Sequence, residues 1–216
     1  MNHKQKTIRL ALAGNPNCGK SVTFNNLTGL HQHVANYPGK TVEQKKGTAS
    51  YGGYTFEIVD LPGTYGLTAF SMEEIVARDY IIEEKPDIVV NILDACNFER
   101  NLYLTLQLLE LEVPVIIVLN MIKLAESRNI SIDAHKLSEL LHVPVLTTEA
   151  KDRTGLDDIL RTAIEVQEGR LSAQVGTAYL DVNLEPRLQE ITDLLAQQSI
   201  SPTTYPLRWT AIKLLE

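Results

Sequence analysis

The stretch that decides the fold is GNPNCGKS, residues 14–21, which completes the pattern GxxxxGK[ST]. It follows an apolar run at 8–12 and precedes a segment of helical periodicity at 20–27, the context that this pattern requires. In such a loop, backbone N–H groups and a helix N-terminus surround nucleotide phosphates. The sequence therefore predicts a P-loop; a glycine-rich turn without a ligand is the alternative. The residues expected to contact the nucleotide here are Asn15, Pro16, Asn17, Cys18, Gly19, Lys20, Ser21 and Val22.

Two further segments fit a phosphate site. In a P-loop, Lys20 reaches the β- and γ-phosphates and the Ser21 hydroxyl binds Mg²⁺. Asp60-Leu61-Pro62-Gly63 follows a predicted strand, so Asp60 is expected to hold Mg²⁺ through water and the Gly63 N–H to sense the γ-phosphate. Thr41, in the turn-rich loop at 36–41, is our choice to complete the Mg²⁺ shell. A threonine that merely begins a strand is the alternative.

Composition is typical of a soluble globular chain. The 216 residues are 44% apolar and 22% charged, with a mean hydropathy of −0.07. The longest apolar run, at 113–119, is far below the roughly 20 residues that span a bilayer. A net charge of −7 gives no basic field for nucleic acid. The two cysteines show no metal-ligand spacing, which favours a reducing cytosol.

Apolar runs of strand length alternate with helical segments along the chain. This predicts an α/β fold, a P-loop NTPase resembling small GTPases, whose mostly parallel six-stranded sheet is covered on both faces. Gly52-Gly53 predicts an antiparallel hairpin at one edge. The expected strands are 8–12, 42–51, 54–60, 88–93, 115–119 and 143–146, and the expected helices are 20–27, 71–83, 97–111, 132–141 and 156–166. Ser71 and Glu74 predict a capping box.

The pattern changes after the last of these helices. A polar stretch at 167–176 precedes two helical candidates, 186–198 and 206–216, without another strand. We therefore expect a P-loop GTPase domain at 1–170 and a small helical domain at 171–216. The amphipathic pattern is still running at Glu216, so we expect the natural protein to continue beyond it.

The individual residues of these motifs also resemble those of one family. Residues 14–29, 35–43, 60–67, 71–81 and 94–111 resemble the cytosolic G domain of ferrous iron transport protein B, FeoB, and 206–216 resembles part of its helical domain. The resemblance runs from about 7 to 166. It implies a domain that binds and slowly hydrolyses GTP and that regulates or drives Fe(II) uptake. It also implies a place on the cytoplasmic face of the bacterial inner membrane, beside the transmembrane Fe(II) permease domain of the same protein.

The resemblance implies catalytic roles as well. In relatives with the same P-loop asparagine, here Asn17, that residue helps to hold K⁺ beside the phosphates, where an arginine finger otherwise acts. Alternatively, Asn17 only tolerates the backbone angles of the loop. The expected catalytic set is Asn17, Lys20, Thr41 and Gly63. Thr64 stands where many GTPases have a water-orienting glutamine, so we expect slow hydrolysis. His31 and His33 are expected to be solvated loop residues.

The expected base pocket departs from the family. Its residues are Asn120, Met121, Lys123, Thr148, Glu149 and Ala150. Lys123 occupies the place of the aspartate that accepts hydrogen bonds from guanine, and Glu149 that of a serine. An ammonium has only donors, and losing a charge-assisted acceptor costs about 1.5–3 kcal/mol. Glu149 either pairs with Lys123 or supplies the missing acceptor.

Three other readings follow. Lys123 favours an NTPase of relaxed base specificity, and slow turnover would suit a nucleotide-gated binding module. A GTPase that acts on tRNA or ribosomes is disfavoured by the acidic charge, and no nucleic-acid partner is expected. The sequence leaves open whether the chain binds small cytosolic partner proteins or forms a homo-oligomer. Cys18 is expected to be a small buried residue, with oxidation-sensitive nucleotide binding as the alternative.

Overall fold

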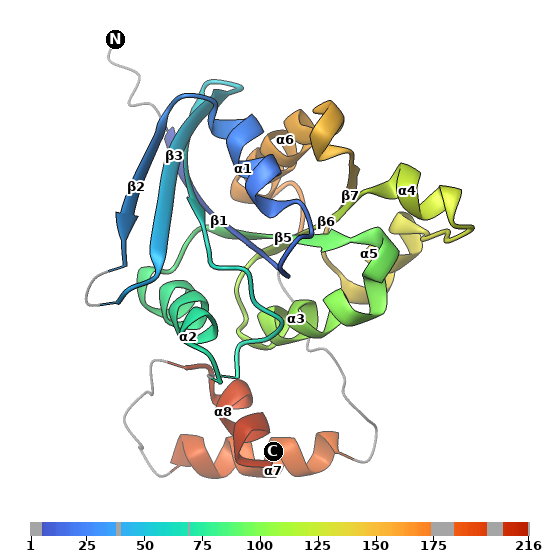
Figure 1. Cartoon of the computed structure of the whole chain (residues 1–216). Helices are drawn as coiled ribbons and strands as arrows, with labels where there is room; N and C mark the ends of the chain where they lie inside the picture. Colours follow the sequence, from blue (N-terminus) through green and yellow to red (C-terminus); the bar gives the residue numbers. More distant parts are fainter. Residues whose placement is uncertain (1–5, 38–39, 69, 174–183, 198–204, 216) are drawn as a thin grey trace.

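A seven-stranded sheet forms the centre of the computed structural model, which describes residues 6–37, 40–68, 70–173, 184–197 and 205–215. The strand order is β2-β3-β4-β1-β5-β6-β7 (Figure 1). Strands β4, β1, β5, β6 and β7 are parallel, whereas β3 is antiparallel to both β2 and β4. The strands are β1 (Lys6–Gly14), β2 (Gln32–Asn36), β3 (Glu43–Tyr51), β4 (Tyr54–Asp60), β5 (Ile88–Asp94), β6 (Val115–Asn120) and β7 (Val145–Thr148).

The predicted fold class is confirmed, but the sheet has one strand more than expected. The hairpin of β3 and β4 is present, and its turn glycines, Gly52 and Gly53, have φ of 56° and 82°. The hairpin does not form the edge, because β2 pairs with the outer side of β3. All five residues of β2 are exposed, so this strand lacks the apolar pattern that marks the others.

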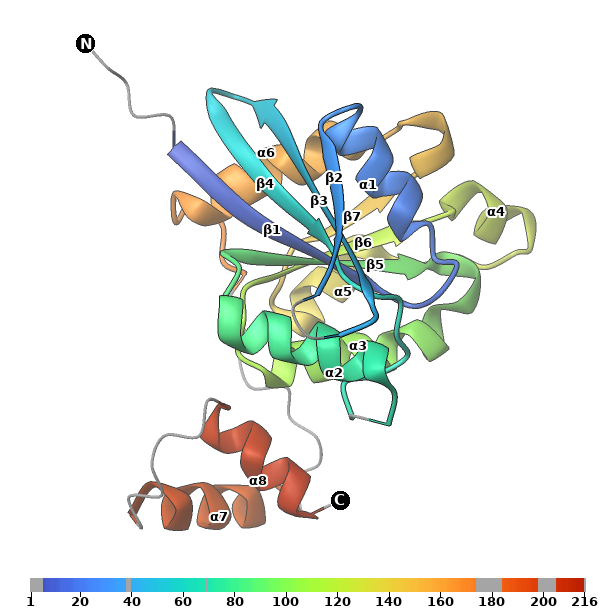
Figure 2. The ribbon, with the colours of Figure 1, turned by 60° about the vertical axis from the view of Figure 1, so that its left-hand side comes forward.

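Helices cover both faces of the sheet, as predicted. In Figures 1 and 2, α1 and α6 lie on one face and α2, α3 and α5 on the other. The helices are α1 (Lys20–Thr28), α2 (Met72–Asp79), α3 (Phe98–Glu110), α4 (Ile122–Ser127), α5 (Ala134–Leu141), α6 (Leu156–Gln167), α7 (Glu185–Gln197) and α8 (Leu207–Leu215). A π-helical turn, Tyr80–Glu84, continues α2. The short α4 was not expected from the sequence.

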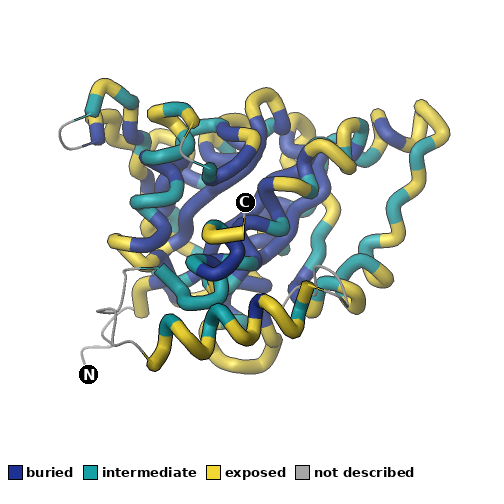
Figure 3. Tube along the Cα trace, turned by 90° about the horizontal axis from the view of Figure 1, so that it is seen from below, coloured by how far each residue is buried: buried dark blue, intermediate teal, exposed yellow. Residues whose placement is uncertain are grey.

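Each face of the sheet buries its own apolar core. Figure 3 shows the buried residues concentrated in the interior of the molecule. On one face, Phe24 of α1 and Leu160 of α6 pack with Phe56 of β4, and Phe24 and Phe56 are fully buried. On the other, Leu108 of α3 packs with Ile117 of β6. Burying an apolar side chain of this size contributes about 1.5–3 kcal/mol. The two cores hold the sheet rigid, so the loops at its carboxyl edge have a fixed base.

Helices α7 and α8 pack on one another beside α2, as Figure 2 shows, and not on the sheet. Leu188 of α7 is buried against Ile212 of α8. Trp209 of α8 joins the core beneath the sheet. Its ring stacks on that of Tyr205, with 4.6 Å between the ring centroids. Parts of the predicted linker and helices, residues 174–183, 198–204 and 216, lie outside the described residues. Among the helices described, none is long and apolar enough to cross a membrane.

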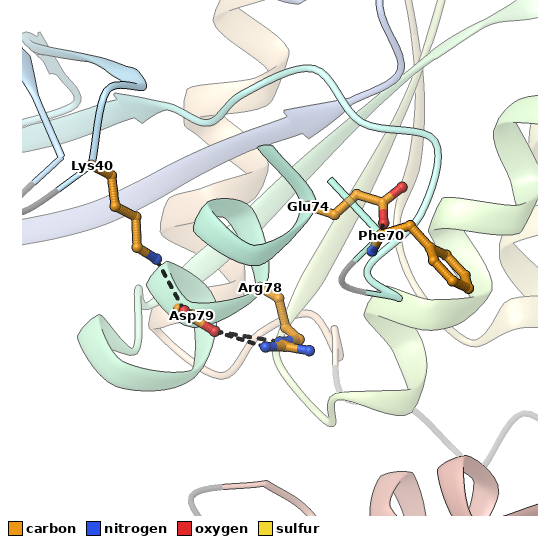
Figure 4. Close-up of polar contacts among 5 residues, drawn as sticks. All are labelled: Lys40, Phe70, Glu74, Arg78 and Asp79. Carbon is orange, nitrogen blue, oxygen red and sulfur yellow. Dashed lines mark hydrogen bonds and ion pairs between the residues drawn. The ribbon is translucent and has the colours of Figure 1, made fainter. Parts of the chain in front are cut away.

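The start of α2 differs in detail from the predicted capping box. Ser71 is the N-cap, and its Oγ accepts from the Glu74 N–H at 3.1 Å, as expected. The Glu74 carboxylate does not return to the Ser71 N–H. Its Oε2 accepts instead from the Phe70 N–H at 3.0 Å (Figure 4). It also accepts from the Thr68 hydroxyl at 3.1 Å. The half of the box made by the Ser71 side chain is therefore present, whereas the Glu74 carboxylate holds the loop before α2 instead of forming the other half.

Candidate functional site

A cleft of about 980 Å³ lies at the carboxyl edge of the sheet, where the loops after β1, β4, β6 and β7 meet. Ligands of open α/β sheets bind at this edge. Its lining residues are Asn15, Pro16, Asn17, Gly19, Lys20, Ser21, Val22, Gly63, Asn120, Met121, Lys123, Leu124, Ser127, Glu149, Ala150 and Lys151. The structure thus brings most of the predicted site residues together. We call the part formed by residues 15–22 and 63 the phosphate end, and the part formed by residues 120–127 and 149–151 the base end.

The loop at the phosphate end has the backbone of an anion-binding turn. Asn17 has a φ of 66° and Gly19, the N-cap of α1, a φ of 94°, both in the left-handed region. This conformation turns successive N–H groups toward the cleft, at the positive end of the helix dipole. Asn17 is exposed, so its amide is accessible from the cleft.

A buried charged cluster lies at the root of this loop. The Lys20 ammonium forms an ion pair with Oδ1 of Asp60, and the Ser21 hydroxyl lies 3.3 Å from Oδ2 of the same carboxylate. Lys20 is only 7% exposed and Asp60 6%. Such a pair is maintained because each charge would be costly to bury alone. The first residues of α1 and the last residue of β4 therefore meet, as the two motifs predicted, although Asp60 itself lies behind the cleft lining.

The side chain of Asn15 is an exception to the usual satisfaction of buried polar groups. It is 3% exposed and lines the phosphate end, yet neither its amide nitrogen nor its amide oxygen has a hydrogen-bond partner among the described residues. An unpartnered buried amide costs about 1–3 kcal/mol. A group of this kind at a cleft is suited to a polar ligand.

Cys18 lies behind the loop and not in the cleft. Its thiol is buried in the core beneath α1, and burial raises its pKa from 9.0 to about 11. A thiol with so high a pKa is a poor nucleophile. This supports the small buried residue over oxidation-sensitive binding. The predicted contact of Cys18 with a ligand is left to its backbone, since its side chain is not part of the cleft lining.

The loop after β4 approaches the P-loop closely. Gly63 lines the cleft, and a Cβ added there would lie 3.3 Å from Cα of Pro16. The Thr64 N–H donates to the carbonyl of Gly14 at 3.3 Å, and Thr64 is buried. The Gly63 N–H is therefore near the place predicted for a γ-phosphate, while Thr64 is used in joining the two loops.

Thr41 is not brought to the cleft. It is exposed in the loop between β2 and β3 and is absent from the cleft lining. The neighbouring Lys40 donates to Asp79 of α2 at 3.1 Å, and Asp79 also pairs with Arg78 (Figure 4). Thr41 as a Mg²⁺ ligand remains a prediction that this arrangement does not support.

Asn120 joins the two ends of the cleft. Its Nδ2 donates to the carbonyl of Cys18 at 2.9 Å, and its Oδ1 accepts from the Ala150 N–H at 3.0 Å and from the Thr148 hydroxyl at 3.2 Å. Both partner segments are held by one amide that is 2% exposed. Thr148 is buried behind the base end and does not line it.

The base end corrects one prediction about Lys123 and Glu149. Their side chains do not form an ion pair. The Lys123 ammonium pairs with Oδ2 of Asp152 at 2.9 Å, while Oε1 of Glu149 accepts from the Lys123 backbone N–H at 2.6 Å. The hydrogen bond between Lys123 and Asp152 raises the pKa of the ammonium and lowers that of the carboxyl. Both side chains are more than half exposed, so this pair contributes little to stability.

Some residues of the site were missed from the sequence. Leu124, Ser127 and Lys151 line the base end. Ser127 lies four positions after Lys123 and three after Leu124, so its place beside both follows once α4 is known to be a helix. His31 and His33 lie at β2 and border a different cavity. The part of the chain that the structure describes holds no cluster of His, Cys, Asp and Glu suited to a metal ion.

Comparison with known proteins places this geometry in one family. The family model of ferrous iron transport protein B matches residues 8–163. The chain is 46% identical over 211 residues to an Fe(2+) transporter FeoB of Methanocaldococcus jannaschii, covering 98% of this chain and 31% of the relative. It is 44% identical over 212 residues to an Fe(2+) transport protein A/Fe(2+) transporter FeoB fusion protein of Porphyromonas gingivalis, covering 97% and 25%. The chain thus spans less than a third of either relative.

Solved structures agree with these sequence matches. The cytosolic domain of the T. maritima FeoB iron transporter superposes with a TM-score of 0.88 in a GDP form and 0.87 in a GMPPNP form. Both are 36% identical to this chain, with 97% and 96% of this chain and 81% of that chain covered. These likenesses extend over the P-loop, the cleft and the C-terminal helices. The chain therefore belongs to the ferrous iron transport protein B family.

Proposed function

We propose that this chain is the domain of an Fe(II) transporter that binds GTP and slowly hydrolyses it, with stimulation by K⁺. The observation that carries the proposal is the buried cluster of Lys20, Asp60 and Ser21 at the root of a P-loop that opens into a cleft. That arrangement is suited to the β- and γ-phosphates of a nucleotide. The T. maritima relatives named as GDP and GMPPNP forms support guanine nucleotides as the ligand.

The residues present fit Mg²⁺. The Ser21 hydroxyl and the Asp60 carboxylate lie 3.3 Å apart and offer the hard oxygen donors that Mg²⁺ prefers. Ser21 would hold the ion directly and Asp60 through water, with Thr41 contributing only if its loop moves to the cleft. When bound, Mg²⁺ supplies charge neutralisation on the phosphate oxygens.

The exposed amide of Asn17 fits K⁺. It lines the phosphate end beside the loop's N–H groups, and an amide oxygen is a suitable ligand for a monovalent cation. The unpartnered amide of Asn15 offers a second oxygen in the same loop. Bound there, K⁺ supplies the positive charge that an arginine finger gives other GTPases.

The chain's own catalytic groups are few. Lys20 binds phosphate oxygens, and the Gly63 N–H donates toward the γ-phosphate. Thr64 is buried and fastened to the P-loop by its backbone, so it does not orient water as a glutamine does. With no side chain acting as a general base, turnover is slow.

The wider role follows the relatives that are named Fe(2+) transporters. In the whole protein, this domain regulates or drives Fe(II) uptake through a transmembrane permease domain, from the cytoplasmic face of the inner membrane. Residues 1–170 form the GTPase domain and residues 171–216 a helical domain. Small cytosolic proteins and a second copy of the chain are further proposed partners.

Single-turnover GTP hydrolysis in KCl and in NaCl tests the proposal. The variant Asn17→Gly removes the amide and keeps the left-handed backbone, because glycine adopts this conformation freely. We expect faster turnover in K⁺ than in Na⁺ for the unaltered chain and no difference for Asn17→Gly. Equal stimulation by K⁺ in the unaltered chain and in Asn17→Gly would show that Asn17 only shapes the loop. No turnover in either salt, with tight GTP binding, would favour a nucleotide-gated binding module.

A second candidate function is an NTPase of relaxed base specificity. The observation that favours it is the exposed ammonium at position 123, where the family has an acceptor. Equal affinities for guanine and adenine nucleotides would support this candidate over the first.

A further inference from the structure

Guanine presents two adjacent hydrogen-bond donors, N1–H and the 2-amino group, so a selective pocket needs an acceptor opposite them. Lys123 cannot be this acceptor, because an ammonium has only donors. Among the described residues that line the cleft, Glu149 is the single carboxylate. Ser127 is a weaker candidate, because its hydroxyl is a neutral acceptor, whereas a carboxylate forms charge-assisted hydrogen bonds with the donors of guanine.

The carboxylate of Glu149 lies against the start of α4. Its Oε1 accepts from the Lys123 N–H at 2.6 Å, in the first turn of this helix. The carboxylate is therefore next to the backbone of the residue whose side chain carries the acceptor in the family. A carboxylate accepts up to about four hydrogen bonds, and the Lys123 N–H is the one partner found for it in the described structure.

The backbone around Glu149 holds this side chain in position. The Glu149 N–H donates to the carbonyl of Thr154 at 3.1 Å, and the Thr154 N–H donates back at 3.2 Å. The next residue, Ala150, is bound to Asn120, which also holds the P-loop. The backbone that carries the acceptor is thus fixed relative to the phosphate end, so only the side chain has to be ordered when a base binds.

The Lys123 ammonium forms an ion pair with a residue outside the cleft lining, not with Glu149. Its partner is Asp152. This pairing leaves the Glu149 carboxylate without an ammonium partner, so its remaining acceptor sites are available to a ligand.

We infer that Glu149 is the residue that determines base specificity, its carboxylate accepting hydrogen bonds from N1–H and the 2-amino group of guanine. The carboxylate has moved from the side chain of residue 123 to that of residue 149, across the same pocket. The inference rests on the proposed GTP-binding function and names the residue by which that site selects its base.

The test removes one hydrogen-bond donor group from the ligand and one acceptor atom from the protein. GDP and IDP differ only by the 2-amino group, and Glu149→Gln replaces one carboxylate oxygen by a donor. Calorimetric titration of both nucleotides, with Mg²⁺ present, should give the unaltered chain roughly a tenfold or greater preference for GDP. Glu149→Gln should lose this preference through weaker GDP binding. Glu126→Gln, an exposed change of the same kind on α4 outside the cleft lining, should keep it.

A second variant covers a failure of Glu149→Gln to fold. Glu149→Ser alone should also lose the preference for GDP over IDP, and adding Lys123→Asp to it, which returns the acceptor to position 123, should restore that preference. An unchanged preference in folded Glu149→Gln would overturn the inference and leave GTP binding intact. Xanthine has a carbonyl at C2 in place of the 2-amino group of guanine. Tighter binding of XDP than of GDP by the unaltered chain would therefore also overturn the inference, since the Lys123 ammonium would then donate to this carbonyl. Absence of binding of any nucleotide would overturn the proposed function itself.

Discussion

The two ends of the cleft are built in different ways. At the phosphate end, the loop backbone, a helix N-terminus and a buried ion pair form the site, and every motif position has the residue type that the chemistry requires. At the base end, side chains form the site, and two that are not buried, Lys123 and Glu149, differ in charge or polarity from the family's residues. A site made of backbone and buried charge tolerates little change, whereas an acceptor on a partly exposed side chain can move to a neighbouring position.

The largest expected effect comes from the buried pair at the phosphate end. Lys20→Met keeps the length of the side chain but leaves the Asp60 carboxylate buried without its cation. Breaking a buried pair from one side costs about 3–5 kcal/mol of unfolding free energy. We expect that loss in urea denaturation, together with GDP affinity at least roughly 100-fold weaker, because charge-assisted phosphate contacts are lost. GDP affinity within about threefold of the unaltered chain would contradict the assignment of the phosphate end.

The next largest effect is expected where Gly19 of the P-loop lies against Asn120, the residue that joins the two ends of the cleft. In Gly19→Ala, the new Cβ would lie 2.1 Å from Nδ2 of Asn120, at a φ of 94°. The matched control is Gly53→Ala, where φ is 82° but no atom lies within 4 Å. We expect Gly53→Ala to lose only the backbone term, about 1 kcal/mol, and Gly19→Ala to lose roughly 2–3 kcal/mol.

Nucleotide titration completes this comparison. Gly19→Ala should weaken GDP and ADP alike, because Asn120 holds the P-loop and the base end together. A loss confined to GDP would mean that the two ends are independent.

A pH effect distinguishes the buried phosphate end from the exposed base end. The Cys18 thiol has a pKa of about 11 in the folded chain against 9.0 as its ordinary value. Below about pH 9 both folded and unfolded chains keep the proton, so this burial costs no stability. Between about pH 9 and 11 only the unfolded thiol loses it, and roughly 2–3 kcal/mol of unfolding free energy should be lost. Cys18→Ala should lack this component in urea denaturation across the same pH range, and an identical pH profile would contradict it.

The smallest expected effect is at the rim of the base end. Asp152→Asn removes the partner of the Lys123 ammonium, and both side chains are more than half exposed. Exposed pairs contribute little to stability, so the midpoint of thermal unfolding should hardly change. A clear fall in that midpoint would show that this pair is structural.

Much of the fold was predictable because its signals are local. Buried parallel strands read as continuous apolar runs, and the P-loop, the hairpin glycines and the N-cap Ser71 lie within short segments. Strand β2 was not predictable, since its two apolar residues, Val34 and Ala35, are exposed and pairing with β3 alone makes it a strand. Helix α4 was missed because it has six residues and its N-cap, Met121, offers no capping side chain.

The candidate site divides in the same way. Lys20, Ser21 and Asp60 were predicted to serve one phosphate and Mg²⁺ site, and the adjacent parallel strands β1 and β4 bring them together. Their direct contacts with one another were not predicted. The partner of Lys123 was not predicted either, because Asp152 lies 29 residues away in a loop whose path depends on a 3₁₀ turn. The position of Thr41 depends on a loop held to α2 by Lys40, which no local pattern reveals.

The most direct test of the account is a calorimetric titration of the unaltered chain with GDP and with ADP, in the presence of Mg²⁺. An intact phosphate end with a relocated acceptor predicts saturable binding of GDP at least about tenfold tighter than that of ADP. Equal affinities for the two nucleotides would contradict it, since the cleft would then bind phosphates without reading the base.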